Sequence, residues 1–203
     1  SGYTFRYEKF LSLTSENSTP LEKVKAYLEC HERDRVSDQE YIFTKKSNFS
    51  WNSIYEILIP YFDNNLSRLD QVYLADYNGK LLYNFNPINS RIVDNFQMKL
   101  ITPIINNKLI KLASHMPSQS KYDEINNIGK LPLRKILKKN GHDSLVNNKK
   151  LGFNVNTLNL WNSHGYNLCK DFLTDSRAVK DGWINDDWIH KHIDNMDLDV
   201  KYI

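Results

Sequence analysis

Residues 19–35, TPLEKVKAYLECHERDR, carry the pattern that decides the fold class of this chain. Thr19 followed by Glu22 is a capping box, the sequence signature of a helix start, because each side chain can satisfy a backbone N–H of the other residue. Pro20 suits the first helical position, where its missing N–H leaves no hydrogen bond unmade. Apolar residues then recur at the spacing of one helical face: Leu21, Val24 and Leu28. This stretch predicts an amphipathic helix.

The same helical period recurs along most of the chain. Further helices are predicted over residues 50–62, 64–79, 103–116, 131–141, 156–173 and 185–196. Turn signals close two of them, Asn78-Gly79 after residues 64–77 and Gly141 after residues 131–140. In the helix over 131–141, an inward-facing stripe is expected from Leu133, Ile136 and Leu137. Asn156 and Asn185 are expected to cap the last two helices.

Residues 81–100 are ambiguous, because a Pro and several Asn make their first half loop-like while their second half fits a helix that ends before Thr102. Residues 117–129 are polar and are expected to form a surface loop. No run alternates apolar and polar residues as a half-buried strand does. Tyr and Phe fall on the apolar stripes, as core residues do. The fold is therefore predicted to be mainly α, a single helical module over residues 1–203 with any sub-boundary near 117–129.

Composition excludes several classes of function. Apolar residues make up 40% and charged residues 25%, which is ordinary for a soluble globular protein. No window approaches the ~18 consecutive apolar residues of a membrane span, and the N-terminus has no apolar signal-peptide core. We therefore expect a cytoplasmic protein with no membrane partner. The net charge is only +3, with Lys and Arg scattered among acids, so nucleic-acid binding, which needs a concentrated basic face, is not expected.

The spacing of cysteines and histidines predicts no metal site. Cys30 and Cys169 do not form a close pair such as C-x-x-C, and buried thiols are the simpler interpretation. His190 and His192 lie two residues apart, so on a helix they point to different sides and cannot easily share a metal ion.

Two groups of residues in the C-terminal half form an ordered motif: Gly129, Lys130, Leu133 and Arg134, then Lys150, Gly152 and Phe153. They resemble the asparagine synthetase family, which has Gly-Lys-x-x-Leu-Arg on a helix followed by an Arg-x-Lys-x-Gly-Phe loop. Asn148 stands where that loop usually has its Arg. Further residues match in the same order: Asp70, Tyr73, Leu74, Pro103, Trp161 and either His190 or His192.

The opening SGYTFRY is similar to the stretch that follows the family's Gly-Asp-x-x-Asp-Glu-Leu-Phe motif, and reads as a chain that starts mid-motif. The resemblance implies the helical C-terminal portion of an α/β PP-loop ATP-pyrophosphatase (adenine nucleotide α-hydrolase-like) synthetase domain. In that family ATP adenylates an aspartate side chain, and ammonia displaces AMP. ATP and Mg²⁺ would be bound mainly by residues before Ser1. The expected partners are the N-terminal nucleotide-binding and glutaminase portions of the same protein, so this chain alone is expected to be inactive.

Lys150 is the predicted catalytic residue. The resemblance implies that this loop lysine stabilises negative charge on the α-phosphate and pyrophosphate. Without the resemblance, Lys149-Lys150 would be interpreted as a solvated pair. Gly152 is a candidate phosphate-binding residue of the same loop, although Gly152 and Phe153 could simply shape and anchor it.

Lys130 and Arg134 are candidates for binding phosphate or an acidic substrate. They lie four residues apart, which predicts one shared helical face, and a helix that merely displays charge explains them equally well. Tyr3 and Arg6 would adjoin the family's acidic motif and either support it or belong to a surface loop.

Three positions depart from the family pattern. Lys99 and Ile101 stand where the family has Glu and Arg, and Asn106 stands where it has Asp. Three hypotheses stay open: a ligase acting on aspartate, a non-catalytic scaffold or binding relative, and an amidotransferase acting on another carboxylate of a sugar or peptide.

Overall fold

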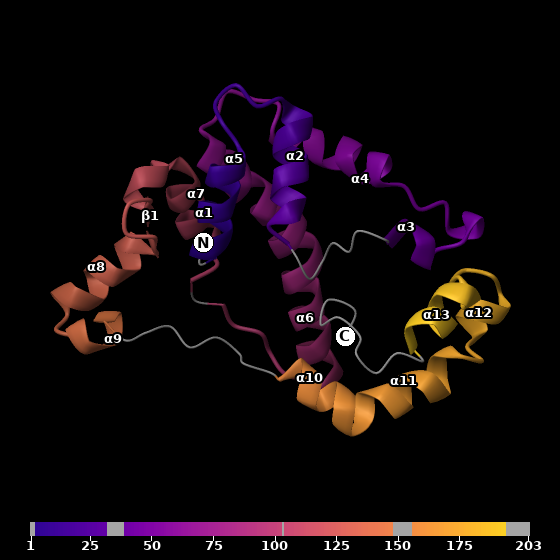
Figure 1. The fold of residues 1–203 in the computed structure, drawn as a ribbon. Coiled ribbons are helices and arrows are strands. Elements are labelled where there is room, and N and C mark those ends of the chain that lie inside the picture. The colour runs from indigo at the N-terminus through magenta and orange to yellow at the C-terminus, as the bar shows by residue number, and fades with distance from the viewer. Residues whose placement is uncertain (1–2, 32–38, 103, 148–155, 194–203) are drawn as a thin grey trace. The chain divides into compact units, whose positions relative to one another are not determined.

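The computed structural model describes residues 3–31, 39–102, 104–147 and 156–193. Nearly all of its regular structure is helical (Figure 1), which confirms the mainly α prediction. The chain divides into two compact units, one containing residues 1–27 and 58–148, the other residues 28–57 and 149–203. Each unit therefore joins segments that lie far apart in the sequence.

The first unit is built mainly from helices. They are α1 (Thr4–Leu13), most of α2 (Pro20–Glu29), the 3-10 turn η2 (Ile59–Tyr61), α5 (Arg68–Ala75), the π-helix η3 (Asp76–Phe85), α6 (Asn86–Asn95), α7 (Asn107–His115), the 3-10 turn η4 (Ser118–Ser120), α8 (Leu131–Lys139) and α9 (Asp143–Asn147). Two antiparallel strands, β1 (Tyr122–Asp123) and β2 (Ile128–Gly129), form the one sheet found in the described part of the chain.

The core of the first unit is aromatic. Its buried apolar side chains include Tyr7, Phe10, Val24, Tyr27, Phe62, Leu69, Val72, Ala75 and Tyr122. The Tyr7 ring meets Tyr73 edge-on at 5.2 Å between centroids and Tyr122 at 5.6 Å. Edge-to-face pairs add about 0.5–1.5 kcal/mol beyond the burial itself, so this cluster ties the hairpin to α1 and α5. Tyr and Phe thus supply much of this core, as predicted, but the prediction is wrong for Phe5, Tyr83, Phe85 and Phe96, which are 45–79% exposed.

The capping box at the start of α2 is present as predicted. The Thr19 backbone N–H donates to Glu22 Oε2 at 2.7 Å, and the Glu22 N–H donates to Thr19 Oγ1 at 3.3 Å. The hydrogen bonds from the Thr19 backbone and hydroxyl stabilise the carboxylate and lower the pKa of Glu22. Pro20 is the first helical residue, and Val24 on the predicted apolar face is fully buried.

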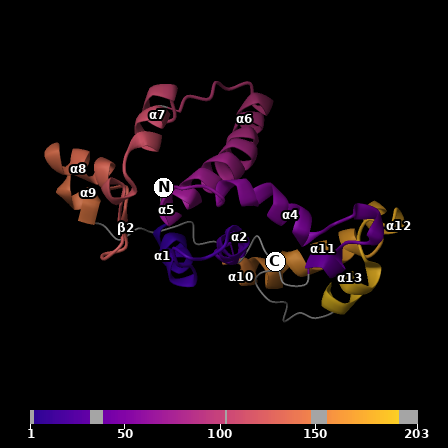
Figure 2. The same ribbon diagram turned by 90° about the horizontal axis from the view of Figure 1, so that it is seen from above.

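The predicted helix end at Asn78-Gly79 is wrong. α5 passes into η3 and η3 into α6, so residues 68–95 form one continuous helical run, which Figures 1 and 2 show from two sides. The Asn78 side chain turns back onto this run, where Nδ2 donates to the Leu74 carbonyl at 2.9 Å. An isolated glycine costs only ~1 kcal/mol in a helix, and tertiary contacts of the neighbouring turn, described below, offset that cost. The first half of residues 81–100, whose composition is loop-like, is helical as well.

Residues 117–129 hold more structure than the predicted surface loop. They contain η4 and the β1–β2 hairpin, and the Tyr122 side chain is only 2% exposed. The Asp123 carboxylate closes the turn by accepting hydrogen bonds from the backbone N–H groups of Ile125 and Asn126. The Asn126 side chain also donates to it and is the largest cause of its lowered pKa. Two-residue strands are too short to show the alternation by which a strand is recognised.

Two amphipathic helices leave their apolar stripes exposed. On α7, Leu109 is 41% and Leu112 is 59% exposed. On α8, Leu133 is 43% and Ile136 is 56% exposed, so the prediction that these two face inward is wrong. Periodicity identifies an apolar stripe but not what covers it.

The second unit is also helical. Its elements are α3 (Gln39–Ile42), the 3-10 turn η1 (Lys45–Ser47), α4 (Trp51–Leu58), α10 (Thr157–Leu160), the π-turn η5 (Trp161–Gly165), α11 (Tyr166–Leu173), α12 (Arg177–Lys180) and α13 (Asp186–Ile193). Both predicted caps are confirmed. Asn156 Oδ1 accepts from the Asn159 N–H at 3.0 Å, and Asn185 Oδ1 accepts from the Asp187 N–H at 3.1 Å.

Backbone contacts join the segment after α3 to the segment before α13. Phe43 forms an isolated antiparallel bridge with Ile184, and the Thr44 N–H donates to the Trp183 carbonyl at 3.2 Å. Lys46 lies over the Trp183 ring, with its ammonium 4.7 Å from the ring centre. These contacts hold together residues that are about 140 positions apart in the sequence.

Candidate functional site

The first motif, residues 129–134, forms the corner where β2 leads into α8. Arg134 lies half-buried in the first turns of α8. Its Nε donates to the Gly129 carbonyl at 3.0 Å, and its Nη1 donates to the Val146 carbonyl of α9 at 2.8 Å. Hydrogen bonds from charged groups contribute about 1.5–3 kcal/mol each. Arg134 therefore holds β2, α8 and α9 together at one corner.

Gly129 is needed at this corner because α1 approaches it closely. A Cβ atom at this position would lie 2.9 Å from Thr4 Cγ2, closer than such atoms approach one another in proteins. The glycine thus brings the motif against the start of the N-terminal helix.

Lys130 precedes α8 instead of lying on it. It is the N-cap residue, in the left-handed conformation with φ 59° and ψ 35°, which costs a non-glycine residue roughly 1–2 kcal/mol. The expected shared helical face of Lys130 and Arg134 is therefore not formed. Lys130 is exposed, whereas the Arg134 guanidinium is turned onto backbone carbonyls. Their assignment to phosphate or substrate binding stays a prediction.

Lys150, Gly152 and Phe153 of the second motif lie outside the described residues. The catalytic role of Lys150 and the phosphate-binding role of Gly152 therefore stay predictions. α9 ends at Asn147, three residues before Lys150 in the sequence. The hydrogen bond from Arg134 to the Val146 carbonyl anchors α9, the last described helix before Lys150 in the sequence.

A buried polar cluster lies in the first unit around Arg6, which the sequence analysis assigned either to support of the family's acidic motif or to a surface loop. Arg6 lies on α1 and is buried, so the surface-loop alternative is wrong for this residue. Arg6 is 4% and Asp76 is 8% exposed. Arg6 Nη2 donates to Asp76 Oδ1 at 3.0 Å, and the Tyr27 hydroxyl donates to the same oxygen at 2.9 Å. Burial, and then the nearby Asp76 charge, raise the pKa of Tyr27. The Arg6 guanidinium also lies over the Tyr3 ring, 5.1 Å from its centre.

This cluster has no sequence signal of its own. Seventy positions separate Arg6 from Asp76. Arg6 lies in the SGYTFRY stretch that carries part of the family resemblance, but no spacing in the sequence pairs it with Asp76. The one available hint was the aromatic composition of the N-terminal stretch, which marks a segment able to pack into a core.

Other motif residues have structural partners. Asp70 pairs with Lys121 at 3.3 Å between Oδ1 and Nζ, and the same ammonium lies 4.7 Å from the centre of the Tyr73 ring. Trp161 is 4% exposed and meets Tyr166 edge-on. The side chains of Asp70, Tyr73 and Trp161 therefore have ion-pair or packing partners within their own units.

One of the three departures from the family pattern has a clear structural role. Asn106 is the N-cap of α7, and its Oδ1 accepts a hydrogen bond from the Leu109 N–H at 3.0 Å. Asp and Asn are comparable N-cap residues, so this exchange keeps the helix start. Lys99 and Ile101 are exposed, Ile101 to 71%.

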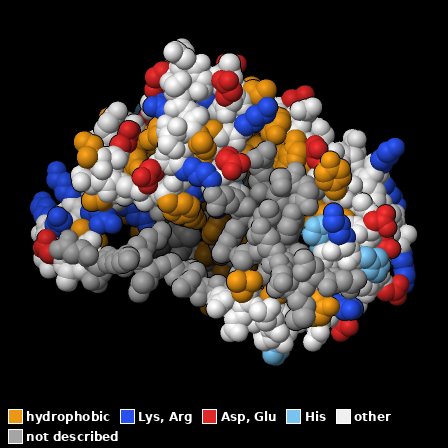
Figure 3. Space-filling model, viewed as in Figure 1, with side chains coloured by type: hydrophobic (Ala, Val, Ile, Leu, Met, Phe, Trp, Pro, Cys, Tyr) orange, Lys and Arg blue, Asp and Glu red, His pale blue; other side chains and the backbone are white. Residues whose placement is uncertain are grey.

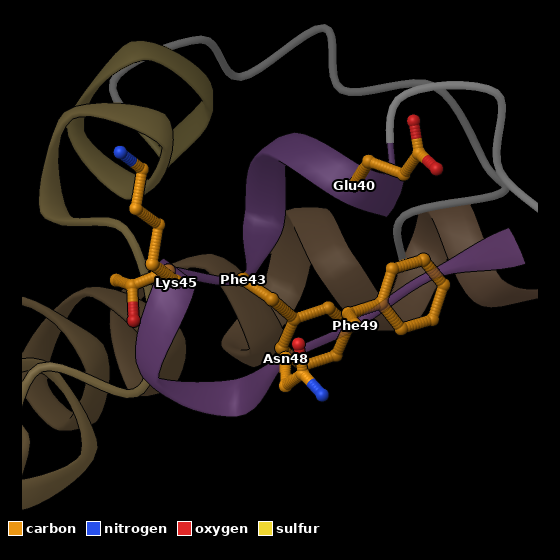
Figure 4. Close-up of a pocket in the computed structure, with 6 residues that line it drawn as sticks. Glu40, Phe43, Lys45, Asn48 and Phe49 are labelled. Atoms are coloured by element: carbon orange, nitrogen blue, oxygen red, sulfur yellow. The ribbon is translucent and has the colours of Figure 1, made fainter. Parts of the chain in front are cut away.

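A cavity of about 420 Å³ lies in the second unit, and no residue of the motifs lines it. It is lined by Glu40, Phe43, Thr44, Lys45, Asn48 and Phe49. The two Phe rings stack at 5.1 Å between centroids. In Figure 4 the charged ends of Glu40 and Lys45 point away from these rings, so the cavity gathers no converging charged groups.

Within residues 3–31, 39–102, 104–147 and 156–193, no three His, Cys, Asp or Glu side chains come together as a metal site would require. The same residues contain no helix that is both long enough and apolar enough to span a bilayer.

Comparison with known proteins gives one match. The family model described as asparagine synthase matches residues 1–200, essentially the whole chain. The search of curated proteins gives no match, and neither does the search of solved structures.

Proposed function

Because this chain belongs to the asparagine synthase family, whose members are in general ATP-dependent, we propose that it takes part in forming an amide from a carboxylate. ATP adenylates the carboxylate, and ammonia then displaces AMP. The family match over residues 1–200 is the observation that carries the proposal. Asparagine is the amide of the aspartate side chain, so aspartate is the default substrate.

Lys150 is the proposed catalytic residue. Adenylation builds negative charge on the α-phosphate and pyrophosphate, and an ammonium fixed beside that charge has its largest effect where water is excluded. The assignment rests on the Lys150, Gly152 and Phe153 motif and on the family match over residues 1–200. Lys130 and Gly152 are proposed to assist in binding phosphate or substrate.

The proposal also needs a nucleotide-binding portion beyond the helices of this chain. Nucleotide phosphates are held by glycine-rich loops of backbone N–H groups, and the seven glycines here form no such loop. We propose that an α/β portion of PP-loop type supplies this loop and the acidic groups for Mg²⁺, and that a glutaminase portion supplies ammonia.

The exposed apolar stripes support such a partner within the same protein. On α6, Ile88 is 52% and Ile92 is 53% exposed, and Leu109 and Leu112 on α7 are similarly open. At about 25 cal/mol per Å² of apolar surface, helices of this kind gain most of their stability by packing on another layer. A sheet flanked by helices is the architecture in which such stripes are covered.

A second candidate is a non-catalytic relative that keeps the helical fold. Lys99 and Ile101 favour it, because an acid and a base of the family are lost together. Asn106 does not favour it, because this residue keeps the helix cap.

Pyrophosphate release separates the candidates. The assay uses the chain together with its nucleotide-binding portion, ATP and an ammonia source, with and without aspartate. Aspartate-dependent release supports the ligase acting on aspartate, and release that needs a different carboxylate supports the related amidotransferase. A protein that binds ATP but releases no pyrophosphate with any carboxylate is the non-catalytic relative.

A further inference from the structure

Several neighbouring exposed cations of the first unit lie on and before α8. They are Lys130, Lys135, Lys138 and Lys139. In Figure 3, blue side chains gather at the left edge, where Figure 1 shows α8 and α9. Residues 130–142 contain no Asp or Glu. None of the four lysines pairs with a carboxylate of the described residues.

Helical spacing places these charges beside exposed apolar side chains. Lys135 is four residues from Lys139, so the two share one side of α8, whereas Lys138 is four residues beyond Arg134 and lies towards the side of that residue. Lys139 is three residues beyond Ile136, which is itself three beyond Leu133, and both aliphatic residues are about half exposed. We call the four residues Leu133, Lys135, Ile136 and Lys139 the α8 face.

The opposite side of α8 is already occupied. Arg134 is bonded to the Gly129 and Val146 carbonyls and fixes the helix against β2 and α9. The α8 face is therefore presented outward on an anchored helix.

Helix stability explains only part of this pattern. Lys138 and Lys139 lie in the last turn, where cations are favoured by the helix dipole. Lys135 lies in the middle of the helix, one turn from both, where like charges repel one another. A partner that brings negative charge would remove this repulsion, and one with apolar side chains would also cover Leu133 and Ile136.

We propose that the α8 face docks an acidic polypeptide segment in which Asp or Glu alternates with apolar residues. Carboxylates pair with the lysines through charge-assisted hydrogen bonds, and the apolar side chains pack on Leu133 and Ile136. Nucleic acid fits less well, because it would leave these two aliphatic side chains uncovered. The net charge of the whole chain is also only +3. A membrane fits less well, because a nine-residue helix with two exposed aliphatic residues offers little apolar area for insertion. This inference is independent of the proposed ligase reaction.

Fluorescence anisotropy with a labelled peptide of Glu-Glu-Leu repeats tests the proposal on the whole chain. The variant Lys135→Glu/Lys139→Glu is compared with Lys108→Glu/Lys111→Glu on α7, which makes the same charge change at two exposed lysines. The α8 pair is expected to weaken binding about tenfold or more, and the α7 pair less than about twofold. Ile136→Ser, which keeps every charge, is expected to weaken binding measurably.

Several results would overturn the proposal. One is the absence of peptide binding, and another is an equal loss in the α8 and α7 pairs. A third is tighter binding to duplex DNA or to phosphatidylserine vesicles than to the peptide in the same assay. Circular dichroism checks that the variants keep their helices, and Lys135→Gln/Lys139→Gln replaces the charge reversal if they do not.

Discussion

The Arg6 guanidinium and the Asp76 carboxylate form a buried ion pair, 3.0 Å between Nη2 and Oδ1, with side chains 5% and 12% exposed. The Tyr27 hydroxyl donates to the same Asp76 oxygen at 2.9 Å. One carboxylate oxygen thus joins α1, α2 and the start of η3, three elements that the chain itself does not bring together.

Removing Asp76 is expected to destabilise the protein strongly. Asp76→Ala leaves the Arg6 charge buried without this carboxylate, and breaking a buried pair from one side costs about 3–5 kcal/mol. Asp181→Ala is the control, because Asp181 pairs with Arg177 at 3.3 Å on the surface, where such pairs contribute less than about 1 kcal/mol. Urea unfolding followed by circular dichroism measures both. Equal losses in the two variants would mean that the Arg6–Asp76 pair does not organise the first unit.

Tyr27 is expected to make stability fall at alkaline pH. In the folded state, burial and the nearby Asp76 charge raise the pKa of Tyr27 above its ordinary value of 10.0. The neutral phenol therefore stabilises the fold fully below pH ~10, and this contribution is lost as the pH rises above that value. The free energy of unfolding of Tyr27→Phe should decrease less steeply than that of the unmodified chain between pH ~9 and ~11. Parallel curves for the two proteins would contradict this assignment.

The contact between Gly129 and Thr4 predicts a compensating pair of substitutions. Gly129→Ala places a Cβ 2.9 Å from Thr4 Cγ2, and overpacking of this kind costs about 1–3 kcal/mol. Gly129 does not have a positive φ, so sterics alone cause the loss. Thr4→Ser removes the clashing methyl group, and the double variant should recover most of the stability in thermal unfolding. If the double variant is no more stable than Gly129→Ala alone, the clash with the Thr4 methyl group is not the cause of the lost stability.

This chain alone is expected to bind ATP weakly. Its seven glycines supply no phosphate-binding loop, and the described residues gather no acidic cluster for Mg²⁺. Calorimetric titration of the isolated chain with Mg²⁺–ATP should show no micromolar affinity. A micromolar dissociation constant would refute the proposal that a separate portion holds the nucleotide.

Local signals in the sequence predicted much of the helical structure. The Thr19–Glu22 capping box and the Asn156 and Asn185 caps appear where they were predicted, because each depends on residues within one turn. Asn78-Gly79 misled the prediction, because a single glycine costs only ~1 kcal/mol in a helix and the chain continues through this turn signal as η3 and α6.

Contacts between distant segments could not be predicted. Nothing in the sequence indicates that Arg6 meets Asp76, or that Arg134 uses its guanidinium on the α9 backbone. The family resemblance, by contrast, depends on the order of short motifs, and the family match supports it over nearly the whole chain.

The most direct test of the proposed ligase reaction compares Lys150→Ala with Lys149→Ala in the protein that includes the nucleotide-binding portion. Losing one preorganised charge from a transition-state site typically costs ~10²–10³ in rate, whereas a surface substitution usually changes stability by less than ~0.5 kcal/mol. Substrate-dependent pyrophosphate release should therefore fall by about 10²-fold or more in Lys150→Ala and stay near normal in Lys149→Ala, with both melting temperatures unchanged. Equal activity in the two variants would contradict the assignment of Lys150 and the catalytic role proposed for this chain.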